Sequence, residues 1–265
     1  MKQILLYSLS LTACFSAFSQ EEQIRSVNHS TLYGTGIAGV YDTYLSPIRY
    51  KGIEIRLLDE SNRMSKYCGG NKLSIQSRID IAASLLKNPS GTATEYTAFA
   101  DWSWGYFYRF HVTEKFRLLA GGLTGLAGGV VYNPRNGNNP VSLKANLALS
   151  LSGMAIYRTN LWQQPITMRL QVSTPVAGMA FSPQYGQSYY EIFGLGNYDN
   201  ILYFSSWKNT FACKTLLSVD IPLNRFTIRI AYLHNMHFNS INGLTSELFS
   251  SSFLIGLSTE LVKIN

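Results

Sequence analysis

A strict alternation of apolar and polar residues is the feature that most constrains the fold of this chain. Over residues 225–238, for example, Phe226 and Ile228 alternate with Thr227 and Arg229. A period of two is typical of strands with two different faces, whereas helical periodicity is absent. Because the pattern recurs from the first third of the chain to its end, it predicts an all-β protein.

The composition indicates which solvent one of those faces meets. Charged residues make up only 14% of the chain, while aromatic residues reach 13%. This balance provides too few polar residues to cover the surface of a soluble domain, but it suits a surface in contact with lipid. No internal run approaches the roughly 18 apolar residues of a membrane-spanning helix. Only a closed barrel of strands then satisfies the backbone in hydrocarbon, so an antiparallel transmembrane β-barrel is predicted.

The alternating segments predict ten strands, an even number as in bacterial single-chain barrels. Two further segments, Tyr189–Phe193 and Ile201–Ser205, would make twelve, but each is shorter than the about 9 residues needed to cross. They are expected to form a loop extension outside the membrane. The predicted strands are Leu32–Tyr44, Gly52–Glu60, Lys72–Leu86, Thr94–His111, Phe116–Val131, Val141–Tyr157, Ile166–Ala180, Trp207–Ile221, Arg225–Phe238 and Ser250–Val262.

Short and long connections alternate along most of the chain. Short turns on the periplasmic side and longer loops outside are typical of such barrels, which places both termini in the periplasm. The short connections are Val112–Lys115, Arg158–Pro165 and Pro222–Asn224, and the longer ones are Lys87–Ala93, Tyr132–Pro140, Ser182–Ser206 and Asn239–Phe249.

The N-terminus has the features of a Sec-type signal peptide. Lys2 precedes the apolar segment Ile4–Ala13 and the small-residue site Ala17–Ser19. An alternative reading takes Leu11–Cys14 as a lipobox, with Cys14 as the lipidated N-terminus.

The expected organisation has three parts. Residues 1–19 are the signal peptide, residues 20–31 a periplasmic segment, and residues 32–265 the barrel. Sec export of such a protein predicts the outer membrane of a Gram-negative-type bacterium as its location.

The formal net charge of +7 is dispersed rather than gathered into a basic stripe. Nucleic acid is therefore not an expected partner, whereas membrane lipids are, since anionic headgroups attract dispersed basic residues. A small solute or a surface ligand is left open as a further partner. No metal-ligand spacing is present and no cofactor is expected. Cys68 and Cys213 lie in dissimilar contexts, which favours two isolated thiols over a disulfide.

The face opposite the apolar one is expected to line a polar lumen. Its acidic and basic residues nearly balance, which favours a lumen filled with ion pairs over a narrow polar conduit, the alternative. The predicted lumen residues are Asp42, Glu54, Arg56, Arg78, Glu95, Asp101, Arg109, Lys144, Arg169, Lys214, Asp220, Arg229 and Glu260. Asp59 and Glu60 are instead interpreted as solvated charges at a strand end.

Residues 95–111 carry an aromatic row on the face expected to meet lipid, a pattern typical of the aromatic girdle of such barrels. This row consists of Tyr96, Trp102, Trp104, Tyr106, Tyr108 and Phe110.

The strongest enzymatic hypothesis is a lipid hydrolase at the rim of the ninth strand. It would use His234 as base and Ser240 as nucleophile, because an acyl ester is attacked where it enters from the membrane. The chain has no His-x-Ser-Asn pattern, so both residues are weak candidates and the protein is expected not to be an enzyme.

Several short motifs resemble a family of exported proteins known as domain of unknown function 3316. They are Tyr33–Gly36, Asp42–Pro47, Tyr50–Leu58, Tyr189–Phe193 and Phe253–Gly256. The resemblance implies a surface-exposed barrel and supplies no catalytic residues. The sequence thus predicts a non-catalytic surface or envelope component with a salt-bridged lumen. A narrow channel or a small-solute or lipid transporter is the alternative, and the lipid hydrolase is the third reading.

Overall fold

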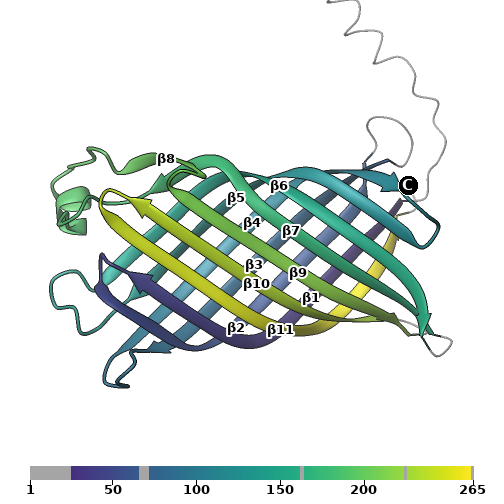
Figure 1. Cartoon of the computed structure of the whole chain (residues 1–265), viewed down its shortest axis with the longest axis horizontal. Coiled ribbons are helices and arrows are strands. Elements are labelled where there is room, and N and C mark those ends of the chain that lie inside the picture. The colour runs from purple at the N-terminus through teal and green to yellow at the C-terminus, as the bar shows by residue number, and fades with distance from the viewer. Residues whose placement is uncertain (1–24, 66–71, 162–163, 224–225, 264–265) are drawn as a thin grey trace, which may run out of the picture.

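Ten strands of the chain close into a single antiparallel barrel (Figure 1). The computed structural model describes residues 25–65, 72–161, 164–223 and 226–263. An eleventh, short strand, β8, pairs with one end of β7. The strands are β1 (Arg25–Asp42), β2 (Ser46–Met64), β3 (Leu73–Lys87), β4 (Thr94–His111), β5 (Phe116–Tyr132), β6 (Val141–Leu161), β7 (Gln164–Phe181), β8 (Leu202–Ser206), β9 (Thr210–Pro222), β10 (Thr227–Ile241) and β11 (Leu244–Lys263).

The wall is closed by two kinds of pairing. Neighbours in the sequence pair along most of the barrel, and β1 pairs with β11 from Arg25↔Lys263 to Asp42↔Ser246. Both described ends of the chain therefore lie at one end of the barrel, which we call the terminal end. We call the other end the loop end, and it carries residues 43–45, 88–93, 133–140, 182–201 and 242–243 (Figure 1).

The ten predicted barrel strands are present, and β4 has the predicted bounds. The strands are generally longer than predicted, and β1 begins at Arg25, inside the segment expected to precede the barrel. The first prediction that fails is the loop Asn239–Phe249. There β10 and β11 continue to a two-residue turn, in which Asn242 and Gly243 have φ of 60° and 72°. An Asn-Gly pair favours this type of tight hairpin turn, so the strands need no longer loop.

The proposed extra hairpin of the twelve-strand alternative is not a pair of spanning strands. Tyr190–Gly194 forms one π-helical turn, and β8 covers only Leu202–Ser206. Both lie toward the loop end, in the chain between β7 and β9, as the loop-extension hypothesis predicts.

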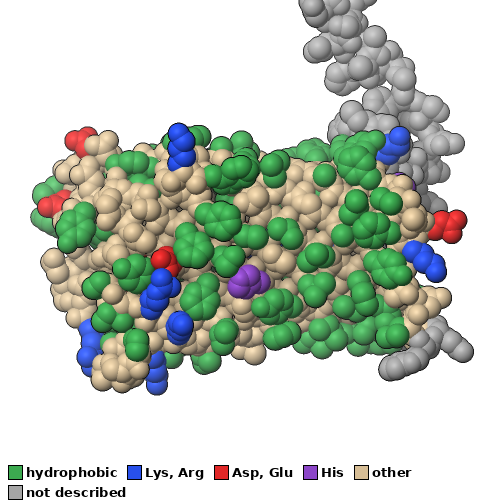
Figure 2. All heavy atoms as spheres, viewed as in Figure 1, with side chains coloured by type: hydrophobic (Ala, Val, Ile, Leu, Met, Phe, Trp, Pro, Cys, Tyr) green, Lys and Arg blue, Asp and Glu red, His purple; other side chains and the backbone are tan. Residues whose placement is uncertain are grey.

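The outer face of the barrel is apolar along its middle. Exposed Ile, Leu, Phe and Trp side chains alternate with inward residues on every spanning strand. Figure 2 shows apolar side chains spread over the visible face of the wall, with Lys, Arg, Asp and Glu mostly toward its two ends. This distribution is typical of a barrel whose middle faces acyl chains. No helix in the described residues is long and apolar enough to span a membrane.

The interior is less uniformly polar than predicted, because three apolar clusters share it with the charges. One cluster, toward the loop end, includes Val40, Tyr50 and Leu86. A second is a layer of leucines around Leu58, Leu216 and Leu233, and a third surrounds Phe107. The alternation rule assigned faces correctly here, but an inward position in a narrow barrel can be filled by either kind of side chain.

Close approach of two strands explains one of the glycines. A Cβ on Gly34 would overlap the carbonyl oxygen of Phe253 on β11, so only glycine allows β1 and β11 to pack as they do.

Three predictions fall on residues outside the described part: the signal peptide, a lipidated Cys14, and Cys68. Cys213, on the outer face of β9, is a free thiol.

The outward position of Ile55 tests the membrane assignment. It lies at the middle of β2 and is 65% exposed. We expect Ile55→Arg to lower the free energy of unfolding in lipid vesicles by about 2–4 kcal/mol, the cost of a guanidinium near the bilayer midplane. Urea titration of the reconstituted protein measures this value. Tyr198→Arg, on an exposed loop residue, is the control, and equal effects of the two substitutions would contradict a lipid-facing wall.

Candidate binding site in the barrel lumen

A network of polar side chains around Glu60 crosses the terminal half of the lumen. Glu60 on β2 forms an ion pair with Arg169 on β7 and lies 3.4 Å from Nη1 of Arg229 on β10. Arg229 also donates to Asp220, with an Nε–Oδ1 distance of 2.6 Å. These four residues carry two negative and two positive charges. Because the pairs join β2 to strands across the barrel, they fill the lumen instead of lining it.

Two amides complete this Glu60 network. Gln76 on β3 and Gln171 on β7 exchange reciprocal hydrogen bonds of 3.0 and 2.8 Å. Gln76 also donates to Oε2 of Glu60 at 3.0 Å. All three side chains are about 1% exposed. A charge buried this deeply is tolerated only where several partners satisfy it, as they do here.

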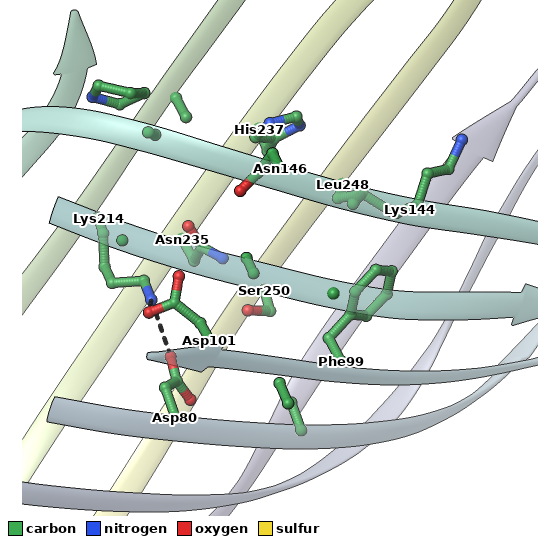
Figure 3. Close-up of a pocket in the computed structure, with 18 of the residues that line it drawn as sticks. Asp80, Phe99, Asp101, Lys144, Asn146, Lys214, Asn235, His237, Leu248 and Ser250 are labelled. Atoms are coloured by element: carbon green, nitrogen blue, oxygen red, sulfur yellow. Dashed lines mark hydrogen bonds and ion pairs between the residues drawn. The ribbon is translucent and has the colours of Figure 1, made fainter. Parts of the chain in front are cut away.

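A second network, around Asp80, lies nearer the loop end. Asp80 accepts from Arg56 at 3.0 Å and from Lys214 at 3.1 Å. Arg56 also contacts Glu54 at 2.9 Å, and Lys214 lies 3.2 Å from Asp101. Figure 3 shows Lys214 reaching from β9 toward both aspartates. Acidic and basic groups from β2, β3, β4 and β9 therefore neutralise one another in the middle of the barrel.

The two networks and the leucine layer leave little room for water in the terminal half. Leu216 and Leu233 are 0% exposed, although both point into the lumen. A conducting pore requires a continuous line of hydrated side chains. Within the described residues, the side chains at this level are instead closely packed, and most of their polar atoms are paired; Nε of Arg169 and Oγ of Ser218 are exceptions.

A cavity of about 220 Å³ remains between the Asp80 network and the loop end (Figure 3). All ten barrel strands and β8 contribute to its lining. Phe99, Phe181 and Leu248 give it apolar surface, while His237 and Lys144 add polar atoms. This volume is enough for several water molecules or one small solute.

Seven side chains that line the cavity carry a polar atom with no hydrogen-bond partner among the described residues. An atom of this kind, once buried, costs free energy unless a water or a ligand satisfies it. The seven atoms are Nε of Arg78, Oδ1 of Asp80, Oγ of Ser103, Oγ1 of Thr210, Nδ1 of His237, Oδ1 of Asn239 and Oγ of Ser246. The lining thus offers donors and acceptors in excess of those that the protein uses itself.

Loops cover the cavity at the loop end. In the loop after β7, Gln187 accepts a hydrogen bond of 2.9 Å from the hydroxyl of Tyr44, in the β1–β2 turn on the far side of the mouth. Tyr189 accepts one from the backbone N–H of Leu143, and Asn242 donates to the carbonyl of Ser182. From the other side, Asn136 donates to the carbonyl of Leu45.

Two tyrosines form the centre of this cover. The rings of Tyr44 and Tyr189 meet edge to face, with centroids 5.5 Å apart. Burial raises the pKa of both phenols, and for Tyr44 the nearby Tyr189, Asp42 and Glu191 act in the same direction. Both therefore stay neutral at physiological pH, as the hydrogen bond that Tyr44 donates requires.

The wall has a break beside the cavity. Pairing of β7 with β9 ends at Ser173↔Lys214, and pairing with β8 begins only at Ala177↔Ser206. Residues 207–213 thus stand opposite the three residues 174–176 of β7. We call this stretch without strand pairing, residues 174–176 and 207–213, the β7–β9 seam. One side-chain bond bridges it: the indole Nε1 of Trp207 donates to the carbonyl of Pro175 at 2.6 Å.

The remaining predicted lumen residues occupy different levels. Lys144 forms an ion pair of 2.7 Å with Asp42, near the loop end. Glu95 accepts from Asn133 at 2.9 Å, and Arg78 is buried between the two networks. Arg109 is half-buried near the terminal end, outside both networks. The side chain of Glu260 lies outside the described part.

The aromatic row of β4 lies on the outer face. Five of its members are large exposed side chains, and Trp104 is half-buried with its ring 5.0 Å from that of Tyr106. The exposed members are Tyr96, Trp102, Tyr106, Tyr108 and Phe110.

The weak catalytic candidates do not meet. His234 lies midway along β10, where its Nδ1 is 2.8 Å from Oγ of Ser251 on the outer wall. Ser240 is six residues further along the same strand, about 20 Å away at about 3.3 Å per residue. A base and nucleophile need hydrogen-bond contact, so the proposed dyad is wrong as a catalytic pair.

Sequence reasoning missed the centres of both networks. Glu60 was interpreted as a solvated charge, and it is 1% exposed instead. Asp80, Gln76 and Gln171 were not singled out. The signal was available, because Glu60 shares the period-two face of Glu54, and Asp80 that of Arg78. Among the described residues, no group of three or more His, Cys, Asp or Glu is arranged to hold a metal ion.

Fold and interior together define an outer-membrane-type β-barrel with a largely filled lumen and one internal cavity. The chain belongs to the family described as protein of unknown function (DUF3316), whose model matches residues 3–265. No curated protein matches the sequence.

Solved structures of other barrels are similar at low identity. The outer membrane protease OmpT from Escherichia coli is 9% identical, with a TM-score of 0.47 over 93% of this chain and 99% of that one. The transport unit of the autotransporter AIDA-I from Escherichia coli is 10% identical, with a TM-score of 0.44 over 94% and 96%. The toluene transporter TodX from Pseudomonas putida is 8% identical, with a TM-score of 0.32 over 93% and 91%.

Loss of Glu60 tests the importance of the network. We expect Glu60→Ala to lower the free energy of unfolding by about 3–5 kcal/mol, because it leaves Arg169 and Arg229 buried with less compensation. Asp59→Ala is the matched control, since the Asp59 side chain is 32% exposed on the outer wall and should contribute less than about 1 kcal/mol. Reversible urea unfolding in detergent or vesicles compares the two. Equal losses would mean that Glu60 is not a buried partner.

Proposed function

We propose that this protein is a closed, non-catalytic component of the outer membrane whose lumen binds a small solute. The cavity with its seven unpartnered polar atoms carries this proposal. A concave site that combines apolar walls with a few convergent polar groups is the usual form of a small-molecule site. We also propose that the loop end faces outward, since longer loops in such barrels lie on the external side.

The packing of the terminal half argues against a permanently open conduit. Leu216, Leu233 and the Glu60 network would all have to move before ions could pass. The separation of His234 and Ser240 gives the hydrolase hypothesis no support. A binding component, present at the surface and covered by its own loops, is the function that agrees best with both observations.

Electrical recording distinguishes a filled lumen from a channel. In planar bilayers we expect the purified protein to give no steady single-channel steps, because no hydrated path crosses the Glu60 network. Steady conductance of the unmodified protein would contradict the closed lumen.

Ligand protection tests the cavity. We would screen amino acids, monosaccharides and short-chain carboxylates for a rise in melting temperature, since a ligand at about 100 times its Kd stabilises by about 2.7 kcal/mol. Ala212→Phe, inside the cavity, should abolish the rise, and Ala83→Phe, on the outer face, should preserve it. Protection that Ala212→Phe leaves unchanged would place the ligand elsewhere.

A further inference from the structure

Along the barrel axis, the cavity lies between packed layers of side chains and the covering loops. Toward the terminal end lie the Asp80 network, the leucine layer and the Glu60 network. Toward the loop end, hydrogen bonds from Tyr44, Asn242 and Asn136 hold the covering loops in place. A ligand that entered along the axis would have to displace one of these layers or loops.

The β7–β9 seam is the weak point of the wall at the same level. Ser173 and Pro175 on one side of the seam, and Ser205, Thr210 and Lys214 on the other, all line the cavity. Pro175 has no N–H to offer a neighbouring strand, and β7 also shifts register against β6 at this point. Unpaired backbone is costly in hydrocarbon, so a break here needs a local substitute for the missing ladder.

Trp207 provides that substitute from the lipid side. Its side chain is 60% exposed, like the neighbouring Phe204 on the outer face of β8. The indole bond to the Pro175 carbonyl spans the gap, yet Trp207 does not line the cavity. One hydrogen bond therefore closes a region where, elsewhere in the barrel, a continuous ladder does so.

The lining indicates the kind of molecule that could use this route. Phe99, Phe181 and Leu248 supply an apolar part, and His237 and Asn239 supply uncharged polar atoms without partners. Arg56, Lys144 and Lys214 are already in ion pairs, so a further charge would compete with their partners. An amphipathic molecule with an uncharged polar group fits both properties, and such molecules dissolve in membranes.

We propose that the cavity takes a small, uncharged amphipathic molecule that enters sideways from the membrane through the β7–β9 seam, with Trp207 as its gate. This inference rests on the proposed solute-binding function and adds to it the chemical class of the ligand and its path.

Exchange of ¹³C-labelled 1-octanol in phosphatidylcholine vesicles, measured by NMR on the reconstituted full chain, tests the path. Trp207→Ala should raise the association and dissociation rates equally, by up to about tenfold. A tenfold change in rate corresponds to about 1.4 kcal/mol, which is the contribution of one hydrogen bond. The Kd should stay constant, because Trp207 does not touch the ligand. Trp207→Phe, which keeps an aromatic ring but loses the N–H, should give most of the same rise, because the hydrogen bond is lost in both variants.

Tyr44→Ala, which loosens the cover at the loop end, is the matched control and should leave both rates unchanged. Faster exchange in Tyr44→Ala, or no change in Trp207→Ala, would overturn the lateral route. Suppose that Ala212→Phe abolishes the binding of polar solutes, but that octanol does not bind in the cavity. This inference then fails, while the proposed function stands. If no molecule binds in a way that Ala212→Phe abolishes, the proposed function itself fails.

Discussion

The rest of the structure depends on one requirement, that a strand in hydrocarbon must pair its backbone on both sides. Closure of β1 on β11 meets this requirement without leaving an edge. Once the wall is closed, the period of two assigns every side chain either to lipid or to the interior. The outer face then needs only apolar residues, whereas the inner face has to solve a packing problem in a narrow space.

The interior solves that problem with charge pairs and leucines in alternating layers. Arg169 and Arg229 are acceptable inside because Glu60 and Asp220 neutralise them, and the amide pair of Gln76 and Gln171 fills the space between. Where this interlocking stops, a cavity begins, and its polar atoms remain without partners. The same cavity lies beside the only long interruption of strand pairing in the described wall, at Pro175.

Sequence patterns predicted the strands well because the membrane imposes a strict period of two, and β4 was found with its exact bounds. They predicted the site less well. The sequence pattern predicts that the second strand ends at Glu60, which makes Glu60 a strand-end charge, whereas β2 continues to Met64. Partners across the lumen, such as Glu60 and Arg169, follow from strand tilt and curvature, which alternation does not encode. The β7–β9 seam also escaped notice, since β8 and β9 share the alternating pattern of their neighbours.

The position of Glu60 has a consequence for how such a barrel is assembled. Its partners come from β7 and β10, more than one hundred residues later in the chain. A partial barrel made of the first strands alone would expose an uncompensated carboxylate on its inner surface, and that surface would resist leaving water. Insertion of a partial barrel is thereby disfavoured, so burial of Glu60 becomes favourable only once β7 and β10 have joined the wall.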